Sequence, residues 1–399
     1  METYERRSLS RRQFLERATV GTAAFTILAP SAARTYAAND KLHLGLIGCG
    51  GRGTWIGQLF QENSETKVVA LHDYFRDRAE SAGKRLEVDA SRWYTGLDGY
   101  HELLSGEVDA VAVESPPYFH PQQSVAALEA GKHVYLAKPI AVDVAGCLDI
   151  LKASQRAGGR LSLLVDFQTR NNELFREAAR RIQAGMIGAP VCGQAYYHTG
   201  RLNVQAPPGT EEARLRNWVF DKALSGDIIV EQNIHVLDVA NWFLGGHPVK
   251  AHGYGGRKAR TDVGDCWDHF VVTYHYPNDV LLDFSSNQFV PGFNDLCTRI
   301  YGEKGTVDAH YGGPVSINAK SEKWPGGTTD QIYREGAVNN IKDFCAGIRK
   351  GQFLNNIEES ANSTLTSILG RMAAYKGRTV TWKEMMRDHK RLDPKLKLG

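Results

Sequence analysis

The 399-residue sequence predicts an α/β protein of two domains, in which a doubly wound parallel sheet precedes an α/β domain with a mostly antiparallel sheet. Three observations support this. Short apolar strands alternate with helical stretches from Leu42 to about Val165. Beyond Phe167 several longer runs alternate apolar and polar residues, as an antiparallel sheet with one covered face does. The chain also exceeds the size of one hydrophobic core.

The elements are expected in the following order. The parallel part has strands at residues 44–47, 67–72, 109–115, 133–137 and 161–165, and a helix at 122–130. The second part has a helix at residues 172–184 and strands at 191–198, 268–276 and 280–287. Two final helices, at 339–350 and 358–376, are expected to pack back on the molecule.

The segment Leu44–Gly53 carries the most specific motif. An apolar strand runs into three spaced glycines, a pattern that binds the pyrophosphate of a dinucleotide. Gly48 would allow the tight turn, Gly50 would let backbone N–H groups approach the phosphates, and Gly53 would let the next helix pack closely. An ordinary glycine-rich turn is the alternative. The turn residues assigned to the cofactor are Gly48, Gly50, Gly51, Arg52 and Gly53.

Asp73 ends the second expected strand and lies 20 residues beyond Gly53. A carboxylate at this place accepts hydrogen bonds from the adenosine ribose, and its charge would repel a 2′-phosphate. The sequence therefore favours NAD over NADP. Arg76 keeps NADP open, because a guanidinium just past the strand could recognise a 2′-phosphate or could simply be solvated.

Residues 1–38 are predicted to be an export signal and linker. The pair Arg11-Arg12 precedes an uncharged, mildly apolar run, residues 18–33, and the segment resembles a twin-arginine signal. The run is too short and too rich in small residues for a convincing membrane span. Because this route exports folded proteins, we expect a periplasmic or otherwise exported protein that meets the export machinery and keeps its nucleotide tightly.

The composition limits the classes of protein to which the chain can belong. With 42% hydrophobic and 23% charged residues, the mature part is expected to be globular, without a stable membrane span. A net charge of +3 gives no reason to propose a nucleic-acid partner. The six cysteines show no C-x-x-C spacing, so neither a zinc site nor a disulfide framework is expected, although one disulfide stays open.

Taken together, residues 41–385 resemble the glucose-fructose oxidoreductase and inositol dehydrogenase (Gfo/Idh/MocA) family. The order and spacing of several segments carry the resemblance, since each segment alone is unremarkable. Besides the glycine turn and Asp73, they are Ser115-Pro116-Pro117-x-x-His120, Gly131–Val134 leading to Ala137-Lys138-Pro139, Gly226-Asp227 leading to Glu231-x-x-x-His235, and Thr379–Trp382.

The resemblance implies the following organisation. Residues 39–165 would be an NAD-binding Rossmann domain, residues 166–385 a substrate-binding and oligomerisation domain with an open, mostly antiparallel sheet, and residues 386–399 a tail. The protein would be a homo-oligomer, a dimer or tetramer. Its reaction would be hydride transfer between a secondary hydroxyl of a sugar, glycoside or polyol and the nicotinamide.

Three residues are the expected catalytic group. Lys138 and His235 match the lysine and the histidine of two family motifs. Alcohol oxidation needs a base for the hydroxyl proton and a cation for the developing alkoxide. His235 suits the first role, and Lys138 suits the second or shares the proton relay. Glu231 lies four residues before His235, on the same face of a helix if the segment is helical, and would orient the imidazole or hold a sugar hydroxyl.

Two positions depart from the family pattern. Ala137 stands where the motif commonly has a glutamate, so a carboxylate thought to contact the nicotinamide ribose is missing. Glu231 replaces the more common aspartate, and its extra methylene moves the carboxylate.

Further residues are assigned with alternatives. His120 would line the nicotinamide pocket or cap a helix, and Arg170 would lie near the nicotinamide amide or form a domain-linking salt bridge. The remaining cofactor residues are Ser115, Pro116, Lys138 and Pro139. The substrate-binding set is Lys138, His198, Arg201, Trp218, Asn233 and His235, whose aromatic members are otherwise packing residues. No metal is predicted, because Glu231, His235 and Asp238 lack a closely spaced third imidazole or thiolate.

The preferred function is an NAD-dependent dehydrogenase of sugars, glycosides or polyols. One alternative is a glycoside-cleaving or epimerising enzyme, in which transient oxidation acidifies a neighbouring C–H and a tightly bound NAD is recycled. Another is a non-catalytic sugar-binding protein with a structural nucleotide, which the retention of Lys138 and His235 disfavours.

Overall fold

The computed structural model describes residues 41–289 and 292–398. The predicted export signal, residues 1–38, lies outside them. Within the described ranges, no helix combines the length and the apolar character that crossing a bilayer requires.

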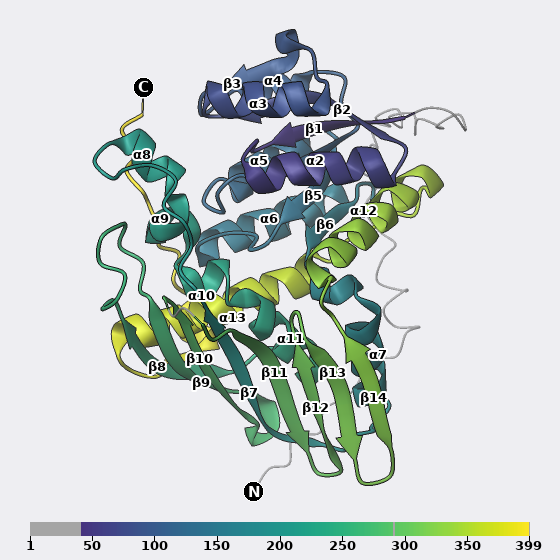
Figure 1. The fold of residues 1–399 in the computed structure, drawn as a ribbon, viewed down its shortest axis with the longest axis vertical. Helices are drawn as coiled ribbons and strands as arrows, with labels where there is room; N and C mark the ends of the chain where they lie inside the picture. Colours follow the sequence, from purple (N-terminus) through teal and green to yellow (C-terminus); the bar gives the residue numbers. More distant parts are fainter. Residues whose placement is uncertain (1–40, 290–291, 399) are drawn as a thin grey trace, which may run out of the picture. The chain divides into compact units, whose positions relative to one another are not determined.

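The first sheet is parallel, in the strand order β3-β2-β1-β4-β5-β6 (Figure 1). The predicted doubly wound parallel sheet is therefore confirmed. Its elements are β1 (Leu42–Ile47), α2 (Gly51–Asn63), β2 (Thr66–Asp73), α3 (Arg76–Leu86), η1 (Ala90–Arg92), β3 (Trp93–Thr95), α4 (Tyr100–Ser105), β4 (Ala110–Val113), α5 (His120–Glu129), β5 (His133–Ala137), α6 (Val144–Ala157) and β6 (Leu163–Asp166).

The strand order indicates where a ligand is expected to bind. Strand β1 pairs with β2 on one side and with β4 on the other, so successive crossovers run in opposite directions from it. In open α/β sheets, ligands bind at this switch point, outside the carboxyl ends of the strands. Gly48 follows β1 and Glu114 follows β4, so both lie at the switch point.

The second sheet follows the order β14-β13-β12-β11-β7-β10-β9-β8-β15 and is antiparallel except for the pair β7–β10. This confirms the predicted mostly antiparallel sheet. The elements of this part are η2 (Gln168–Asn171), α7 (Glu173–Gln183), β7 (Pro190–Thr199), α8 (Glu211–Arg216), η3 (Trp218–Phe220), α9 (Lys222–Ser225), α10 (Ile228–Glu231), α11 (Ile234–Leu244), β8 (Lys250–Gly256), β9 (His269–His275), η4 (Pro277–Asp279), β10 (Leu281–Gln288), β11 (Asp295–Gly302), β12 (Gly305–His310), β13 (Pro314–Ala319), β14 (Lys323–Thr328), α12 (Ile332–Lys350), α13 (Ile357–Lys376), β15 (Val380–Thr381) and α14 (Trp382–Met386).

The two C-terminal helices join the sheets. Helix α12 contacts α2 and β6, and its buried Phe344 packs edge to face on Phe60 and Tyr135 of the first part. Helix α13 contacts α6 as well as β8 and α11. The expected packing of these helices on the molecule is thus observed, and α12 completes a layer over the first sheet although it follows the second sheet in sequence.

One face of the second sheet is covered by helices, because α7, α11 and α13 contact its strands. Strand residues that point the other way are more accessible. Tyr254 and Val271 on neighbouring strands are both exposed large hydrophobic residues. We call this the open face of the second sheet.

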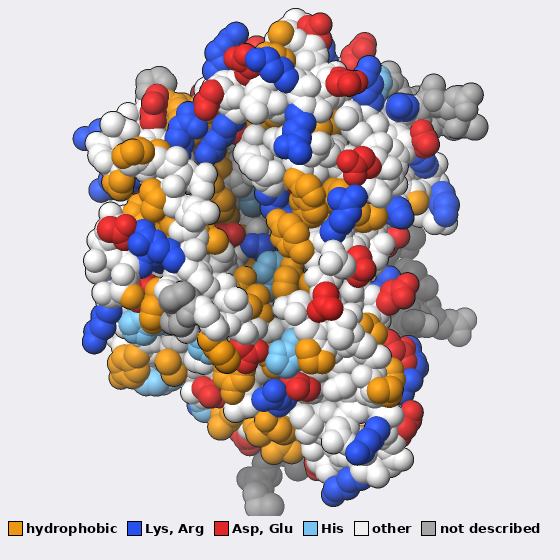
Figure 2. Space-filling view, viewed as in Figure 1, with side chains coloured by type: hydrophobic (Ala, Val, Ile, Leu, Met, Phe, Trp, Pro, Cys, Tyr) orange, Lys and Arg blue, Asp and Glu red, His pale blue; other side chains and the backbone are white. Residues whose placement is uncertain are grey.

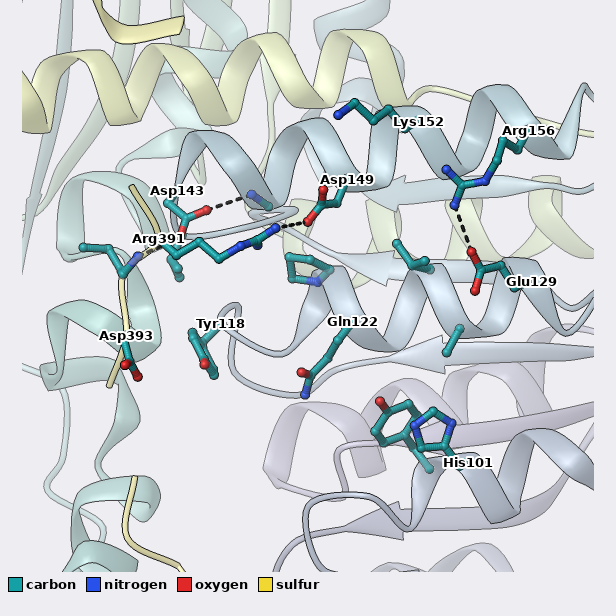
Figure 3. Close-up of a pocket in the computed structure, with 17 residues that line it drawn as sticks. His101, Tyr118, Gln122, Glu129, Asp143, Asp149, Lys152, Arg156, Arg391 and Asp393 are labelled. Carbon is teal, nitrogen blue, oxygen red and sulfur yellow. Dashed lines mark hydrogen bonds and ion pairs between the residues drawn. The ribbon is translucent and has the colours of Figure 1, made fainter. Parts of the chain in front are cut away.

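The chain beyond α14 crosses back to the first part. Arg391 forms an ion pair with Asp149 of α6, and the backbone N–H of Leu392 donates to Asp143 Oδ2 at 2.8 Å (Figure 3). Farther on, Leu396 and Leu398 pack partly buried against an apolar cluster. The core of that cluster consists of Phe75, Phe119, Leu215 and Leu224.

Candidate active site

The glycine turn has the shape that a dinucleotide phosphate needs. Gly48 has φ +94°, and a Cβ there would lie 2.5 Å from the backbone N of Ser115. A Cβ on Gly53 would lie 1.8 Å from the Gly48 carbonyl oxygen, so α2 approaches β1 as closely as only glycine permits. Gly50 and Gly51 face open space at the N-terminus of α2. The turn therefore fits a pyrophosphate on backbone N–H groups.

A pocket beside β2 continues from this turn, and we call it the β2 pocket. Its lining includes Asp73, whose Oδ2 accepts from the Cys49 N–H at 2.8 Å and whose Oδ1 accepts from the Phe75 N–H at 2.9 Å. The arginine in this lining is Arg78, whereas Arg76 is exposed. The lining also includes Gly48, Ser115, Pro116, Phe119 and Leu215.

We call the expected catalytic residues, Lys138, Glu231 and His235, the catalytic cluster, and Lys138 and Glu231 form its first half. Lys138, one residue beyond β5, donates from Nζ to the backbone oxygen of Glu231 at 2.5 Å and to its Oε1 at 3.1 Å. Both side chains are mostly buried. An ammonium group has three hydrogens, so these two bonds leave one N–H of Lys138 for a ligand.

His235 forms the second half, and its surroundings differ from the expected helix. Helix α10 ends at Glu231 and α11 begins at Ile234, so the segment is broken and Glu231 bonds Lys138 rather than the imidazole. The His235 ring is buried, 5.1 Å from the Tyr311 ring, and its Nδ1 has no hydrogen-bond partner among the described residues. Burial, with the charges of Lys138 and Arg52, lowers the pKa of His235 well below its usual value. A neutral imidazole can accept a proton.

Asn233 lies at the break between these helices. It is fully buried, and neither its side-chain oxygen nor its side-chain nitrogen has a partner among the described residues. Such an amide can both donate to and accept from ligand hydroxyls. Of the predicted substrate residues, the structure brings Lys138, Asn233 and His235 into one cluster.

Arg52 extends the cluster toward the glycine turn. It pairs with Asp166 at the end of β6, and its Nε lies 3.4 Å from Glu114 Oε2. Although burial opposes the charge, these two carboxylates hold the pKa of Arg52 above its usual value. The guanidinium also lies over the rings of Trp55 and Tyr333. Neither Glu114 nor Asp166 was predicted from the sequence, although Glu114 follows β4 at the switch point and its place at a strand end was a usable signal.

His120 and Pro139 connect two loops below the site. The His120 ring is buried, with Nδ1 at 2.7 Å from the Pro139 carbonyl oxygen and Nε2 at 2.7 Å from that of Ser115. Burial lowers the pKa of His120 to about 4, so the ring is neutral near neutral pH and donates to one of the two carbonyls. His120 therefore holds the loop after β4 against the loop after β5.

Four residues that were predicted for the cofactor or substrate site lie outside the group formed by Lys138, Glu231, Asn233 and His235. Arg170 forms a bidentate pair with Asp238 at 2.8 and 2.9 Å, a salt bridge within residues 166–385 and not the domain-linking pair that was the expected alternative. His198 points away from Tyr197, toward the open face, where it bonds Asn287. The remaining two are Arg201, which pairs with Asp262, and Trp218, which packs on the apolar cluster under the tail.

No disulfide links the six cysteines, all of which lie in the described ranges. On the open face, Asp295, Cys297 and His310 place possible ligand atoms within 4.8 Å of one another. These atoms already have protein partners, since Asp308 Oδ1 lies 3.3 Å from both Cys297 Sγ and His310 Nε2. The trio is far in sequence and on the opposite side of the sheet from the catalytic cluster.

The surface is hollowed where a ligand would enter. Figure 2 shows a hollow in the middle of one face, with basic and histidine side chains deep inside and hydrophobic side chains along its rim. An enclosed site of this kind, with a few convergent polar groups, is typical of small-molecule binding.

Two family models match the chain. "Oxidoreductase family, NAD-binding Rossmann fold" matches residues 42–165, and "GFO/IDH/MocA C-terminal domain" matches residues 175–308. The chain is also similar to inositol 2-dehydrogenase 2 of Saccharopolyspora erythraea, with 27% identity over 294 residues, covering 73% of this chain and 80% of that protein.

A second relative and a solved structure are also similar to this chain over most of its length. Inositol 2-dehydrogenase of Burkholderia multivorans is 30% identical over 268 residues, which cover 66% of this chain and 72% of that protein. Among solved structures, a levoglucosan dehydrogenase in complex with NADH shares the fold, with a TM-score of 0.71, 17% identity, and coverage of 86% of this chain and 99% of that chain. Because the two family models match residues 42–165 and 175–308 in this order, the chain belongs to the Gfo/Idh/MocA family of NAD-binding oxidoreductases.

Proposed function

We propose that this protein oxidises a secondary hydroxyl of a sugar, glycoside or polyol and passes the hydride to NAD. One observation carries the proposal. A buried histidine with an unpaired Nδ1 and a lysine with an uncommitted N–H, His235 and Lys138, lie together near the carboxyl ends of the strands that hold the dinucleotide turn.

The two residues divide the work of alcohol oxidation. The His235 imidazole accepts the hydroxyl proton, because burial keeps it neutral. The remaining N–H of Lys138 stabilises the oxygen as negative charge develops on it. Glu231 fixes the Lys138 ammonium through two hydrogen bonds, at its backbone oxygen and at Oε1. When bound, the nicotinamide supplies the hydride acceptor.

The polar atoms left unpaired in this cluster favour a ligand with several hydroxyls. Glu231 Oε2 and both side-chain polar atoms of Asn233 are buried without partners among the described residues. Each would cost about 1–3 kcal/mol if it stayed unpaired, and hydroxyls that both donate and accept would satisfy all three atoms. The names of the relatives, inositol 2-dehydrogenase and levoglucosan dehydrogenase, agree with such a substrate.

We further propose that NAD is preferred over NADP and is held tightly. Asp73 at the β2 pocket supports the preference, because its carboxylate would repel a 2′-phosphate. Phe75, Phe119 and Leu215 line this pocket and belong to the apolar cluster against which Leu396 and Leu398 of the C-terminal tail pack, which supports slow release. Tight retention suits an exported enzyme, which is how we interpret the twin-arginine resemblance of residues 1–38.

The open face supports a homo-oligomer. Exposed hydrophobic residues such as Tyr254 and Val271 would be covered there by a second copy. Light scattering of the purified protein measures the mass directly, and a monomer at micromolar concentration would contradict this part of the proposal.

The test of the reaction is absorbance at 340 nm with a panel of inositols, pyranoses and aryl glycosides, after the retained nucleotide has been identified by mass spectrometry. Net NADH formation from a polyol or sugar supports the dehydrogenase. Release of the aryl group without net NADH would instead favour the recycled-cofactor alternative. Sugar binding with neither signal would favour a binding protein.

A further inference from the structure

One carboxylate beside the glycine turn takes no part in the proposed reaction. Glu114 follows β4 directly, and its side chain is only 1% exposed. Neither of its oxygens has a hydrogen-bond partner among the described residues. Because burying an unpaired carboxylate is costly, a group left in this state is expected to meet a ligand.

Arg52 does not satisfy Glu114. The closest approach is 3.4 Å, from Arg52 Nε to Glu114 Oε2, which is an ion pair and too long for a good hydrogen bond. The better bond of Arg52 goes to Asp166. Arg52 therefore supplies charge beside Glu114 and leaves its oxygen lone pairs available.

The location of Glu114 points to the cofactor. A Cβ on Gly53 would lie 3.2 Å from the Cβ of Glu114, so the side chain lies directly against the dinucleotide turn. Burial raises the pKa of Glu114 to about 7, and the charges of Arg52, Asp166 and Lys138 also act on it. Glu114 thus lies against the turn and is near enough to Lys138 to feel its charge.

The pairing of β4 with β5 connects Glu114 with Ala137. The register runs to Val113 opposite Leu136, so the next residues of the two strands, Glu114 and Ala137, end side by side. Ala137 is the position at which the family motif commonly has a glutamate. Its methyl group leaves the space before Lys138 open to a carboxylate from the neighbouring strand.

We propose that Glu114 accepts hydrogen bonds from the hydroxyls of the ribose on the nicotinamide side of NAD, and so positions the ring. The inference rests on the proposed function, since it requires a dinucleotide on the glycine turn. The carboxylate offers two oxygens to two vicinal hydroxyls, and Arg52 beside it favours the charged form that accepts both.

The test compares Glu114→Gln with the wild-type protein by calorimetric titration of three probes. NADH and ADP-ribose contain the second ribose, and ADP lacks it. We expect Glu114→Gln to lower the affinity for NADH and for ADP-ribose by about tenfold each. The affinity for ADP should change by no more than about twofold. Equal weakening of all three probes would show that Glu114 only braces Arg52 and the turn, and would overturn the proposal.

Two further outcomes would also overturn it. If the variant lost affinity for NADH but not for ADP-ribose, Glu114 would lie at the nicotinamide ring. If the affinity for all three probes were unchanged and the KM for the polyol were raised, Glu114 would lie at the substrate. If wild-type protein binds no NADH, the proposed function fails, and the inference fails with it for that separate reason.

A second experiment moves the carboxylate from position 114 to position 137 and asks whether cofactor affinity returns. In the Glu114→Ala background, the second substitution Ala137→Glu places a carboxylate on the neighbouring strand end. We expect the double variant to recover ADP-ribose affinity to within about threefold of wild type, while Glu114→Ala alone does not. Thermal melting of each variant verifies folding, and a folded double variant without recovery would contradict the equivalence of the two positions.

Discussion

At the β2 pocket, the polar group expected to meet the cofactor already has protein partners, whereas near the ends of β4 and β5 several buried polar groups have none. Asp73 accepts two backbone N–H bonds, at 2.8 and 2.9 Å, in a pocket whose lining includes Arg78 as well as apolar side chains such as Phe75 and Leu215. Around Lys138, by contrast, Glu114, Asn233 and His235 each keep unpaired polar atoms.

The difference assigns two tasks to two regions of one site. A group already fixed by backbone bonds is preorganised, so the β2 pocket can hold the nucleotide with little rearrangement. Buried unpaired groups destabilise the free protein by about 1–3 kcal/mol each, and ligand binding would remove that penalty. Substitutions near Lys138 should therefore change the reaction, and substitutions at the β2 pocket should change affinity or cofactor choice.

The largest effect is expected for His235→Ala. Loss of the proton acceptor should lower kcat by about 10²–10⁴-fold, and the dissociation constant of NADH should stay within about threefold. Stopped-flow measurement of NADH formation gives kcat, and fluorescence titration gives the affinity. His275→Ala, on the face of β9 that carries Val271, is the matched control and should behave like wild type. Normal turnover of His235→Ala would refute the base assignment.

The pH dependence tests the same residue. Burial, with the charges of Lys138 and Arg52, lowers the pKa of His235 well below 6.5. The free enzyme therefore keeps a neutral imidazole as the pH falls through 6.5, and the acid limb of kcat/KM should begin below that pH. An acid limb at or above pH 6.5 that disappears in a weakly active His235 variant would contradict the assignment.

A smaller loss, of about 10²–10³-fold in kcat/KM, is expected for Lys138→Met. This variant should also be less stable by about 1–3 kcal/mol, because the Glu231 carboxylate is left buried without its cation. The double variant Lys138→Met/Glu231→Gln should regain the stability and stay inactive, which denaturant unfolding and kinetics together would measure. Lys152→Met, at an exposed position of α6, is the control. A double variant that regains activity would show that Lys138 only neutralises Glu231.

The contrast between the two regions also explains what the sequence could predict. The glycine turn, Asp73, Lys138 and His235 belong to short local motifs, so the sequence could mark them as candidates, the last two through the family resemblance. The contact of Lys138 with Glu231 joins residues 93 apart, and that of Arg52 with Asp166 joins residues 114 apart, so both depend on how the chain folds back.

The second sheet shows the same limit at the scale of one residue. Tyr197 is buried on the helix-covered side and His198 points to the open face, yet both sides of β7 carry aromatic rings. The alternation along a strand predicts that the two side chains oppose each other. Which of them faces the catalytic cluster is decided by helices from other parts of the chain.

At the β2 pocket the expected change is in cofactor choice. Asp73→Ser should lower the affinity for NAD by about 10–100-fold and the affinity for NADP by less, so the preference for NAD should become smaller. Arg78 lines this pocket and Arg76 is exposed, so adding Arg78→Ala should lower the affinity for NADP further and adding Arg76→Ala should not. Calorimetric titration of both nucleotides measures the ratio. If Arg76→Ala lowered the affinity for NADP instead, the 2′-phosphate would lie outside the pocket.

The smallest effect is expected from the tail that covers the apolar wall of the β2 pocket. Leu396 and Leu398 pack against the cluster that includes Phe75 and Leu215, so replacing both leucines by serine should loosen that wall. The dissociation rate of NADH should rise about 3–10-fold, because less apolar surface is buried over the pocket.

The residues between the two leucines provide the control for this last prediction. Lys395 and Lys397 are exposed, so replacing both by serine changes the tail to the same extent without removing apolar contacts. The control should release NADH at the wild-type rate, and kcat at saturating NAD should be unchanged in both variants. If the leucine and lysine variants release NADH equally fast, retention comes from the glycine turn and Asp73 alone, and the tail is only a link between the two parts of the fold.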